Sequence, residues 1–326
     1  MTDTRFPGPA EAAPARAGGS WWAPGRVGLI TYVVILGLYC VTQGIPMDRI
    51  GQTGWILLGI VAARIGQPLQ AHAQAILDWL PLLAALIIYD HTRGIADTIG
   101  MPVRVEELAD AERTLFGGTI PTVWLQQHLY DPAQVHWWDF GVSLVYFSHF
   151  VVPWVLAAVF YMRSHPAWSR YIRRVLMLSY AGLVTYVLLP AAPPWYAARF
   201  GEIPEHVSRI ASRGWDVLGL HSAGAWLSEA QAGVNQVAAL PSLHSAFALL
   251  VAVVLWPRVR LRAWRVVLAL YPLAMAFTLV YGGEHYVVDV LAGWLYVAVV
   301  VLVARWWEGR RAPEAAPAPV AEPVAR

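Results

Sequence analysis

Residues 286–306 read YVVDVLAGWLYVAVVVLVARW, with one carboxylate near the start and one arginine near the end. A helix that spans a bilayer needs about 20 mostly apolar residues, and this run meets that length. Six further apolar runs, of which 239–256 is slightly short, lie at roughly 28–46, 73–90, 138–161, 172–190, 239–256 and 262–281. The sequence therefore predicts six to seven transmembrane helices. Residues 55–63 are apolar but too few to cross, which predicts an interfacial or re-entrant helix.

Composition excludes a soluble globular domain. Of the 326 residues 58% are hydrophobic and 13% are charged, about half the charged share of a soluble domain. A net charge of +2 gives no footprint for a nucleic-acid partner, and the single cysteine, Cys40, excludes an intrachain disulfide and a multi-cysteine metal cluster. The expected fold is an all-α polytopic transmembrane bundle. It comprises a catalytic domain over 27–310 and, from their Ala- and Pro-rich composition, disordered tails over 1–26 and 311–326.

Arginine placement predicts the orientation in a cell (plasma) membrane. Arginines gather after 138–161, after 239–256 and at the end of 286–306. The parity of the helices puts these regions on one side, which the positive-inside rule assigns to the cytoplasm. The loops 91–137 and 191–238 then face outward, and residues 103–115 are expected to form an amphipathic helix on the membrane. Seven spans place the N-terminus outside, whereas the arginines among residues 1–26 favour the inside, so both orientations of the first helix stay open.

The first chemical cluster opens the run at 239–256 and reads LPSLHSAF over 240–247. Pro241 suits the first turn of a helix, where its missing N–H is not needed. The free N–H groups of such a turn can hold a phosphate. Ser242 and Ser245 can add hydroxyl donors, and His244 lies within the same turn.

The second cluster, YGGEHYVVD over 281–289, joins two predicted spans. His285 and Asp289 are four residues apart, so a helix brings them to one face. A carboxylate there holds the imidazole in one tautomer and stabilises its charged form. An ionisable residue inside a span is a candidate functional residue. We therefore expect phosphoryl transfer without metal or organic cofactor, in which His285 attacks phosphorus and His244 handles the proton.

The two clusters resemble the second and third signatures of the type-2 phosphatidic acid phosphatase superfamily, over roughly residues 73–306. The resemblance implies a six-helix core with His285 as nucleophile, His244 as acid and base, and Asp289 as the orienting carboxylate. The family's usual cations are missing, because 189–196 reads LPAAPPWY and Thr278 and Leu279 stand where Ser-Arg is common.

The stretches PPWY at 193–196 and YDHTRG at 89–94 resemble the inositol phosphorylceramide synthase branch, whose members are inositolphosphotransferases. This implies a phospholipid or polyprenyl-phosphate substrate in the membrane, with inositol, a lipid alcohol or water as acceptor. Arg93 is the candidate for the missing phosphate-binding charge. Tyr196 is a candidate for lining a lipid entrance, and Glu284 for contacting an acceptor headgroup.

Other interpretations stay open from the sequence. Simple hydrolysis of a lipid phosphate or polyprenyl pyrophosphate uses the same residues. A metal site would need a third ligand beside His285 and Asp289, such as Glu284 or His149, although a hydrogen bond between helices is the expected role of His149. Another alternative is a transporter in which His and Asp form a proton relay. Inverted repeats would favour a transporter, and the sequence does not display them. A lipid-binding scaffold without activity is the remaining alternative, and the sequence carries no signal for the oligomeric state.

Overall fold

The structure, a computed structural model, describes residues 24–46, 48–218 and 235–311. The tails predicted over 1–26 and 311–326 therefore lie outside the described residues, except for 24–26 and 311, which belong to helix ends. In chain order the described helices are α1 (Pro24–Gln43), α2 (Arg49–Ala63), α3 (Leu69–Gly94), η1 (Ala96–Thr98), α4 (Glu106–Leu115), α5 (Pro121–Leu129), α6 (Trp137–Arg163), α7 (His165–Leu188), α8 (Pro194–Arg199), η2 (Arg213–Leu218), α10 (Leu243–Leu255), η3 (Trp256–Arg258), α11 (Arg262–Tyr281) and α12 (Val287–Arg311).

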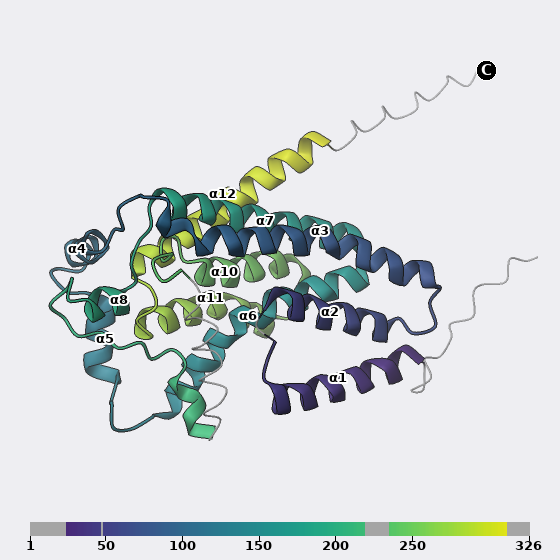
Figure 1. Cartoon of the computed structure of the whole chain (residues 1–326), viewed down its shortest axis with the longest axis horizontal. Coiled ribbons are helices and arrows are strands. Elements are labelled where there is room, and N and C mark those ends of the chain that lie inside the picture. The colour runs from purple at the N-terminus through teal and green to yellow at the C-terminus, as the bar shows by residue number, and fades with distance from the viewer. Residues whose placement is uncertain (1–23, 47, 219–234, 312–326) are drawn as a thin grey trace, which may run out of the picture.

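The long helices lie side by side in one bundle (Figure 1), and the predicted all-α transmembrane fold is confirmed. Within the described ranges, α1, α3, α6, α11 and α12 are long and apolar enough to cross a membrane. The other two predicted spans correspond to α7 and α10. In α7, arginines in the first half of the helix interrupt the apolar run. Helix α10 has 13 residues, about 20 Å of helix, which is shorter than a hydrocarbon layer about 30 Å thick.

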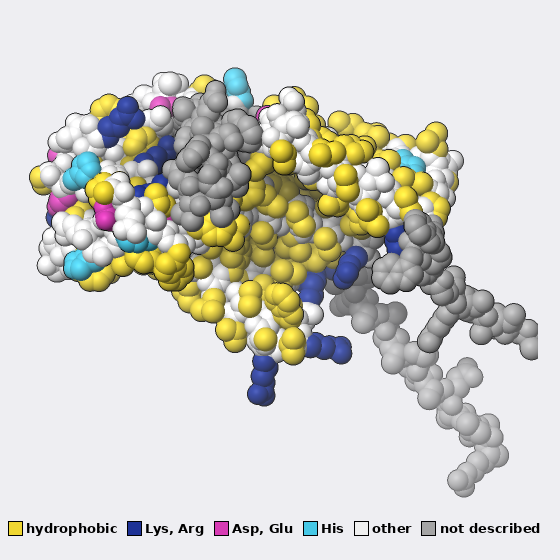
Figure 2. All heavy atoms as spheres, turned by 90° about the horizontal axis from the view of Figure 1, so that it is seen from below, with side chains coloured by type: hydrophobic (Ala, Val, Ile, Leu, Met, Phe, Trp, Pro, Cys, Tyr) yellow, Lys and Arg dark blue, Asp and Glu magenta, His cyan; other side chains and the backbone are white. Residues whose placement is uncertain are grey.

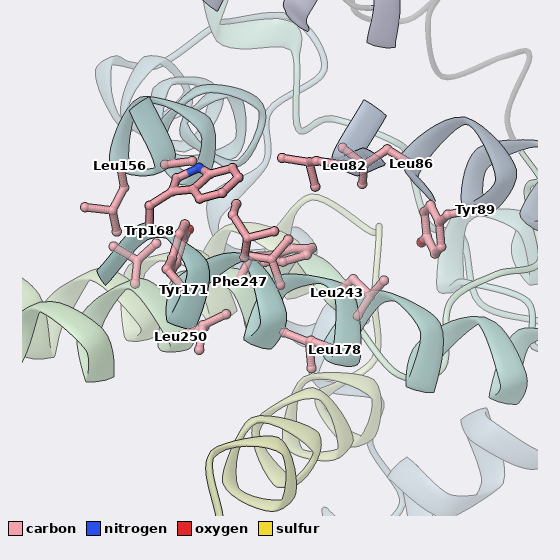
Figure 3. Packing of buried hydrophobic residues seen from close by; sticks show 14 of the residues in the cluster. Leu82, Leu86, Tyr89, Leu156, Trp168, Tyr171, Leu178, Leu243, Phe247 and Leu250 are labelled. Carbon is pink, nitrogen blue, oxygen red and sulfur yellow. The ribbon is translucent and has the colours of Figure 1, made fainter. Parts of the chain in front are cut away.

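Helices α7 and α10 lie in the middle of the bundle, where α7 packs against α3, α6, α10 and α12. Figure 3 shows the resulting core, in which Leu82 and Leu86 of α3 and Leu156 of α6 lie around Tyr171 and Leu178 of α7. These side chains are almost fully buried. Their packing holds α10, which carries the first chemical cluster, in the centre of the molecule.

Helix α2 contains the apolar run at 55–63, for which the sequence predicts an interfacial or re-entrant helix. The helix begins earlier than its apolar run, at Arg49, because the Asp48 carboxylate caps it by accepting the Gly51 N–H. It runs antiparallel to α1, since Gly25 lies against Ala63 while Gly59 lies against Tyr32. It also packs on α3 and α6. A pair of antiparallel helices at the start of the chain puts the beginning of α1 at the same end of the bundle as the arginine-rich ends of α6 and α12 (Figure 1), the arrangement that the N-terminal arginines favour.

The two ends of the bundle differ in character. In Figure 2 hydrophobic side chains cover the middle of the molecule, and carboxylates, histidines and arginines gather at the end that carries α4, α5 and α8. Here the expected amphipathic helix at 103–115 forms as α4, but its apolar face packs on the protein. Leu108 and Ala109 are buried in a cluster with Trp195 and Tyr286, and α4 contacts α12.

Backbone bridges tie together the connections at this end. Arg104 pairs with Ala191, and Ala191 pairs with Ala238, both in parallel fashion. Three connections therefore meet at this end of the bundle: the loop after α3, the loop after α7 and the segment that enters α10. This junction holds the polar end of the molecule in a fixed arrangement.

Candidate active site

The second chemical cluster forms the connection between α11 and α12. Gly283 has φ +76°, a left-handed conformation that glycine adopts readily and that turns the chain into α12. Nδ1 of His285 lies 3.4 Å from Oδ2 of Asp289, within ion-pair reach but not aligned as a hydrogen bond. The same Oδ2 accepts the Tyr286 N–H at 2.9 Å. With Nδ1 facing the carboxylate, the other nitrogen of His285, Nε2, is the one available to a substrate.

The first cluster forms the N-terminus of α10, which begins at Leu243, two residues later than Pro241 suggested. Ser242 is the N-cap, and its hydroxyl accepts the Ser245 N–H at 3.4 Å. The Ser245 hydroxyl in turn donates to the Ser242 carbonyl at 3.0 Å. Both serines are fully buried, so their polar groups serve the helix cap rather than the cavity described below.

Helices α10 and α12 pack very closely at this point. The Ser242 N–H donates to the Asp289 carbonyl at 2.9 Å. A Cβ on Gly293 would collide with the Ser242 carbonyl and would lie 2.7 Å from Ser245 Oγ. Glycine at 293 is therefore required for the close approach, and the backbone contact links His244 with Asp289 across the two helices.

The two motif histidines face one another. The ring centroids of His244 and His285 are 5.6 Å apart and their planes are tilted by 59°. This is contact distance for two rings, so a reacting group has to lie beside the pair and not between the rings. His244 stacks on Tyr146 at 5.2 Å and lies 4.1 Å from the ring of His149. Nδ1 of His149 is buried without a hydrogen-bond partner among the described residues, so the hydrogen bond expected between helices is replaced by contact with His244.

A cavity of about 360 Å³ opens beside the histidines. Its wall includes Glu284, three histidines and three arginines, namely His149, His244, His285, Arg49, Arg93 and Arg209. Arg93 lies in the last turn of α3, and its Nε is buried without a partner among the described residues. The cavity therefore combines three imidazoles with three guanidinium groups, a composition suited to a phosphate. Arg49 and Arg209 are each paired with a carboxylate.

Arg209 is held in place by its neighbours. It forms a two-pronged ion pair with Glu284, at 2.8 Å and 3.0 Å, and its guanidinium lies 4.8 Å above the ring of Trp195. Burial acts to lower the pKa of Arg209, but the adjacent Glu284 carboxylate raises it overall. The flanking backbone is fixed as well, since the Ser208 N–H donates to the Gln126 side chain at 2.9 Å. Arg209 thus presents a fixed, charged guanidinium to the cavity that His285 also lines.

Not every predicted residue lines the cavity. Its wall contains His244, His285, Arg93 and Glu284 but neither Ser242, Ser245 nor Tyr196. Tyr196 instead packs against Trp195 and Phe200, and Asp289 acts from behind His285. In the part of the chain that the structure describes, the His, Cys, Asp and Glu side chains form no group of three that could hold a metal ion.

A buried carboxylate stands behind the site. Glu112 of α4 is fully buried, and its Oε1 accepts the Val288 N–H in the first turn of α12 at 3.1 Å. Burial raises the pKa of Glu112 to about 7, and the nearby Asp289 adds to the effect. Glu112 therefore caps the helix that carries Asp289. With its pKa raised to about 7, the carboxyl changes from protonated to ionised near neutral pH.

Sequence reasoning did not identify Arg209, Tyr146 or the cavity role of His149. Arg209 lies in a loop without periodicity. The one feature of the sequence that could have suggested it as a phosphate-binding residue is its positive charge in a loop predicted to face outward. Tyr146 and His149 are three residues apart within the span 138–161, so their shared helix face was a usable signal.

The comparisons with known proteins agree with this geometry. A family model described as PAP2 superfamily matches residues 106–303. A phosphoinositol dihydroceramide synthase from Bacteroides thetaiotaomicron is similar to the chain, with 27% identity over 292 residues, covering 83% of this chain and 89% of the relative. No solved structure matches the chain at comparable significance.

Proposed function

Because the chain belongs to the PAP2 superfamily, and hence is an enzyme that handles lipid phosphates, we propose that it transfers a phospho-headgroup between lipids through a phosphohistidine. The observation that carries the proposal is the pair of neighbouring imidazoles, with ring centroids 5.6 Å apart, that both line the cavity with Asp289 behind His285. The relative's name, phosphoinositol dihydroceramide synthase, supports phosphoinositol as the group transferred and a ceramide as acceptor.

In the first step, Nε2 of His285 attacks phosphorus and the bond from phosphorus to the oxygen of the departing lipid alcohol breaks. His244 donates a proton to that oxygen, so the alcohol leaves neutral. Asp289 holds His285 by Nδ1 and stabilises the positive charge that the ring acquires. The non-bridging oxygens lie against Arg93 and Arg209, which meet the charge that the family's missing motif cations would otherwise meet.

In the second step, His244 takes a proton from the hydroxyl of the acceptor. That oxygen attacks phosphorus, the nitrogen–phosphorus bond breaks and His285 is released. The proton that His244 gave in the first step is recovered in the second, so the cycle closes without a cofactor. The reaction takes place at the outer membrane face, a side supported by the arginine-rich ends at the opposite end of the bundle.

The test uses purified protein in chelator with phosphatidylinositol tritiated in the inositol ring and a fluorescent ceramide. We expect a labelled lipid that carries both inositol and the fluorophore. A single-turnover quench should capture acid-labile, alkali-stable label on His285. His285→Ala and His244→Ala should abolish transfer, whereas His128→Ala, at an exposed histidine of α5, should not change it.

Each alternative has its own outcome. Release of free phosphoinositol without a new lipid would identify a hydrolase. Loss of activity in chelator, restored by a divalent cation, would overturn the metal-independent mechanism. Undiminished turnover of His285→Ala would exclude this residue as nucleophile.

A further inference from the structure

The cavity is too small to hold a whole lipid. Its volume of about 360 Å³ lies near the lower end of the roughly 300–1,000 Å³ typical of small-molecule sites. That space accommodates a phosphorylated headgroup but not the hydrocarbon chains as well. If the proposed function holds, the chains of a bound lipid must leave the cavity sideways into the membrane.

One wall of the cavity is suited to this exit. It consists of the first turn of α2, the last turns of α3 and the middle of α6, represented by Arg49, Leu86 and Trp154. On the side of α10 and α12 there is no such exit, because these two helices pack tightly against each other at Gly293. Helix α2, in contrast, lies at the outside of the bundle (Figure 1), and α1 beyond it has no buried residue.

A second, narrow hollow continues from this wall. It shares Arg49, Leu86 and Trp154 with the main cavity and is lined farther on by Ile56. The lining runs from Arg49 to Ile56 along α2, seven residues or about 10 Å of helix, away from the histidines. It measures about 10 Å³, room for about one water molecule. Side chains must therefore move aside before a chain can enter.

An ion pair stands where the two hollows meet. Arg49 donates to Asp90 at 2.6 Å and 3.3 Å, and its guanidinium lies 5.3 Å from the ring of Trp154. Both charged side chains are partly exposed, at 26% and 33%, and Arg49 also donates to Gln52 at 3.3 Å. If Arg49 rotates away from Asp90, the polar cavity and the second hollow become continuous.

We propose that the hollow between α2, α3 and α6 is the binding track for a hydrocarbon chain of the lipid substrate, with the Arg49–Asp90 pair as its threshold. The occupant is a lipid chain because Ile56, Trp79 and Leu82 line the far part of the track, beyond the polar Gln52 and Thr53, and because the track continues from the main cavity. Helices α1, α2 and α3 lie outside the family match at 106–303, so of the three helices around this track only α6 belongs to the matched core.

The test compares long-chain with short-chain phosphatidylinositol as donors. Ile56→Trp fills the track and should lower the ratio of kcat/KM for the long-chain donor to that for the short-chain donor by roughly tenfold or more. Leu58→Trp is the matched control, because Leu58 lies on the same helix but is exposed and outside the track. It should leave the ratio unchanged. An unchanged ratio in Ile56→Trp, or an equal change in both variants, would overturn the proposal.

A second measurement does not depend on turnover and so separates this inference from the proposed reaction. Phosphatidylinositol with a photoreactive diazirine near the middle of one chain is irradiated with the full-length protein in lipid nanodiscs, and the adducts are mapped by mass spectrometry. Adducts at Ile56, Trp79 or Leu82, reduced in Ile56→Trp and competed by unlabelled lipid, support the track. Adducts confined to the outward faces of the helices contradict it, whatever the enzymatic result.

Discussion

Replacing Arg209 with methionine removes a phosphate-binding charge and also breaks an ion pair. The Glu284 side chain is only 8% exposed, and that of Arg209 is 31% exposed. Loss of one partner of a buried pair costs about 3–5 kcal/mol because the other charge is left without compensation. The partial exposure of Arg209 places the expected loss at the lower end, about 3 kcal/mol. Loss of one preorganised donor to a transition-state oxyanion separately lowers kcat by about 10²–10³.

The two effects are separated by a second substitution. Arg209→Met combined with Glu284→Gln removes both charges, so we expect the free energy of unfolding to return to within about 1 kcal/mol of the wild type while kcat stays about 10²-fold or more lower. Glu284→Gln alone keeps the guanidinium and should retain most of the activity. The assay combines thermal unfolding in one fixed detergent with headgroup transfer under saturating donor. A double variant with near wild-type kcat would refute the role of Arg209 at phosphorus, and a single Arg209→Met variant as stable as the wild type would refute the structural importance of the pair.

Three further predictions concern the start of α12. Asp289→Asn should lower kcat by about 10²–10⁴ with little change in KM, because an amide does not stabilise the charged imidazole. Steady-state kinetics at a fixed detergent concentration measure both constants, and a change in KM alone would contradict the prediction. Glu112 has a raised pKa, so the folded state loses stability as pH rises through about 7. Glu112→Gln should therefore be more stable than the wild type by up to about 3 kcal/mol above pH 8 and equal to it near pH 4.5, as followed by unfolding across that range; a constant difference would exclude the ionisation. Gly293→Ala should cost about 1–3 kcal/mol and reduce transfer, whereas Gly309→Ala, where a Cβ meets nothing within 4 Å, should change neither unfolding nor activity; equal behaviour of the two would argue against close packing.

The sequence was sufficient for the class of fold but not for the position of every helix. Apolar runs of about 20 residues have one stable solution in a membrane, because a helix satisfies all of its own backbone hydrogen bonds. The run at 55–63 failed this length criterion. The structure extends it to Arg49 through polar residues that face the cavity, as Gln52 does. The amphipathic pattern of α4 was visible, but no pattern in a sequence states whether an apolar face meets lipid or protein.

The candidate site divides in a similar way. His244, His285 and Asp289 stand in short motifs at the starts of helices, where local spacing fixes the geometry. Arg209 reaches the cavity only because its loop folds back onto Gln126 and Gly282. Such contacts between distant parts of the chain leave no periodic signal in the sequence. For Ser242 and Ser245 the motif was evident in the sequence. The direction of each hydroxyl was not, because it depends on the packing against the neighbouring α12.

The close packing of α10 on α12 separates two parts of the molecule that can evolve independently. Glycine at 293 and the backbone bond from Ser242 to Asp289 leave almost no freedom where the histidines stand, so substitutions there are tolerated poorly. Helix α1 has no buried residue, and its exposed side chains can be exchanged among apolar types at little cost. A lineage can therefore adapt its outer helices to membranes of different thickness and chain composition while it inherits the reaction centre unchanged.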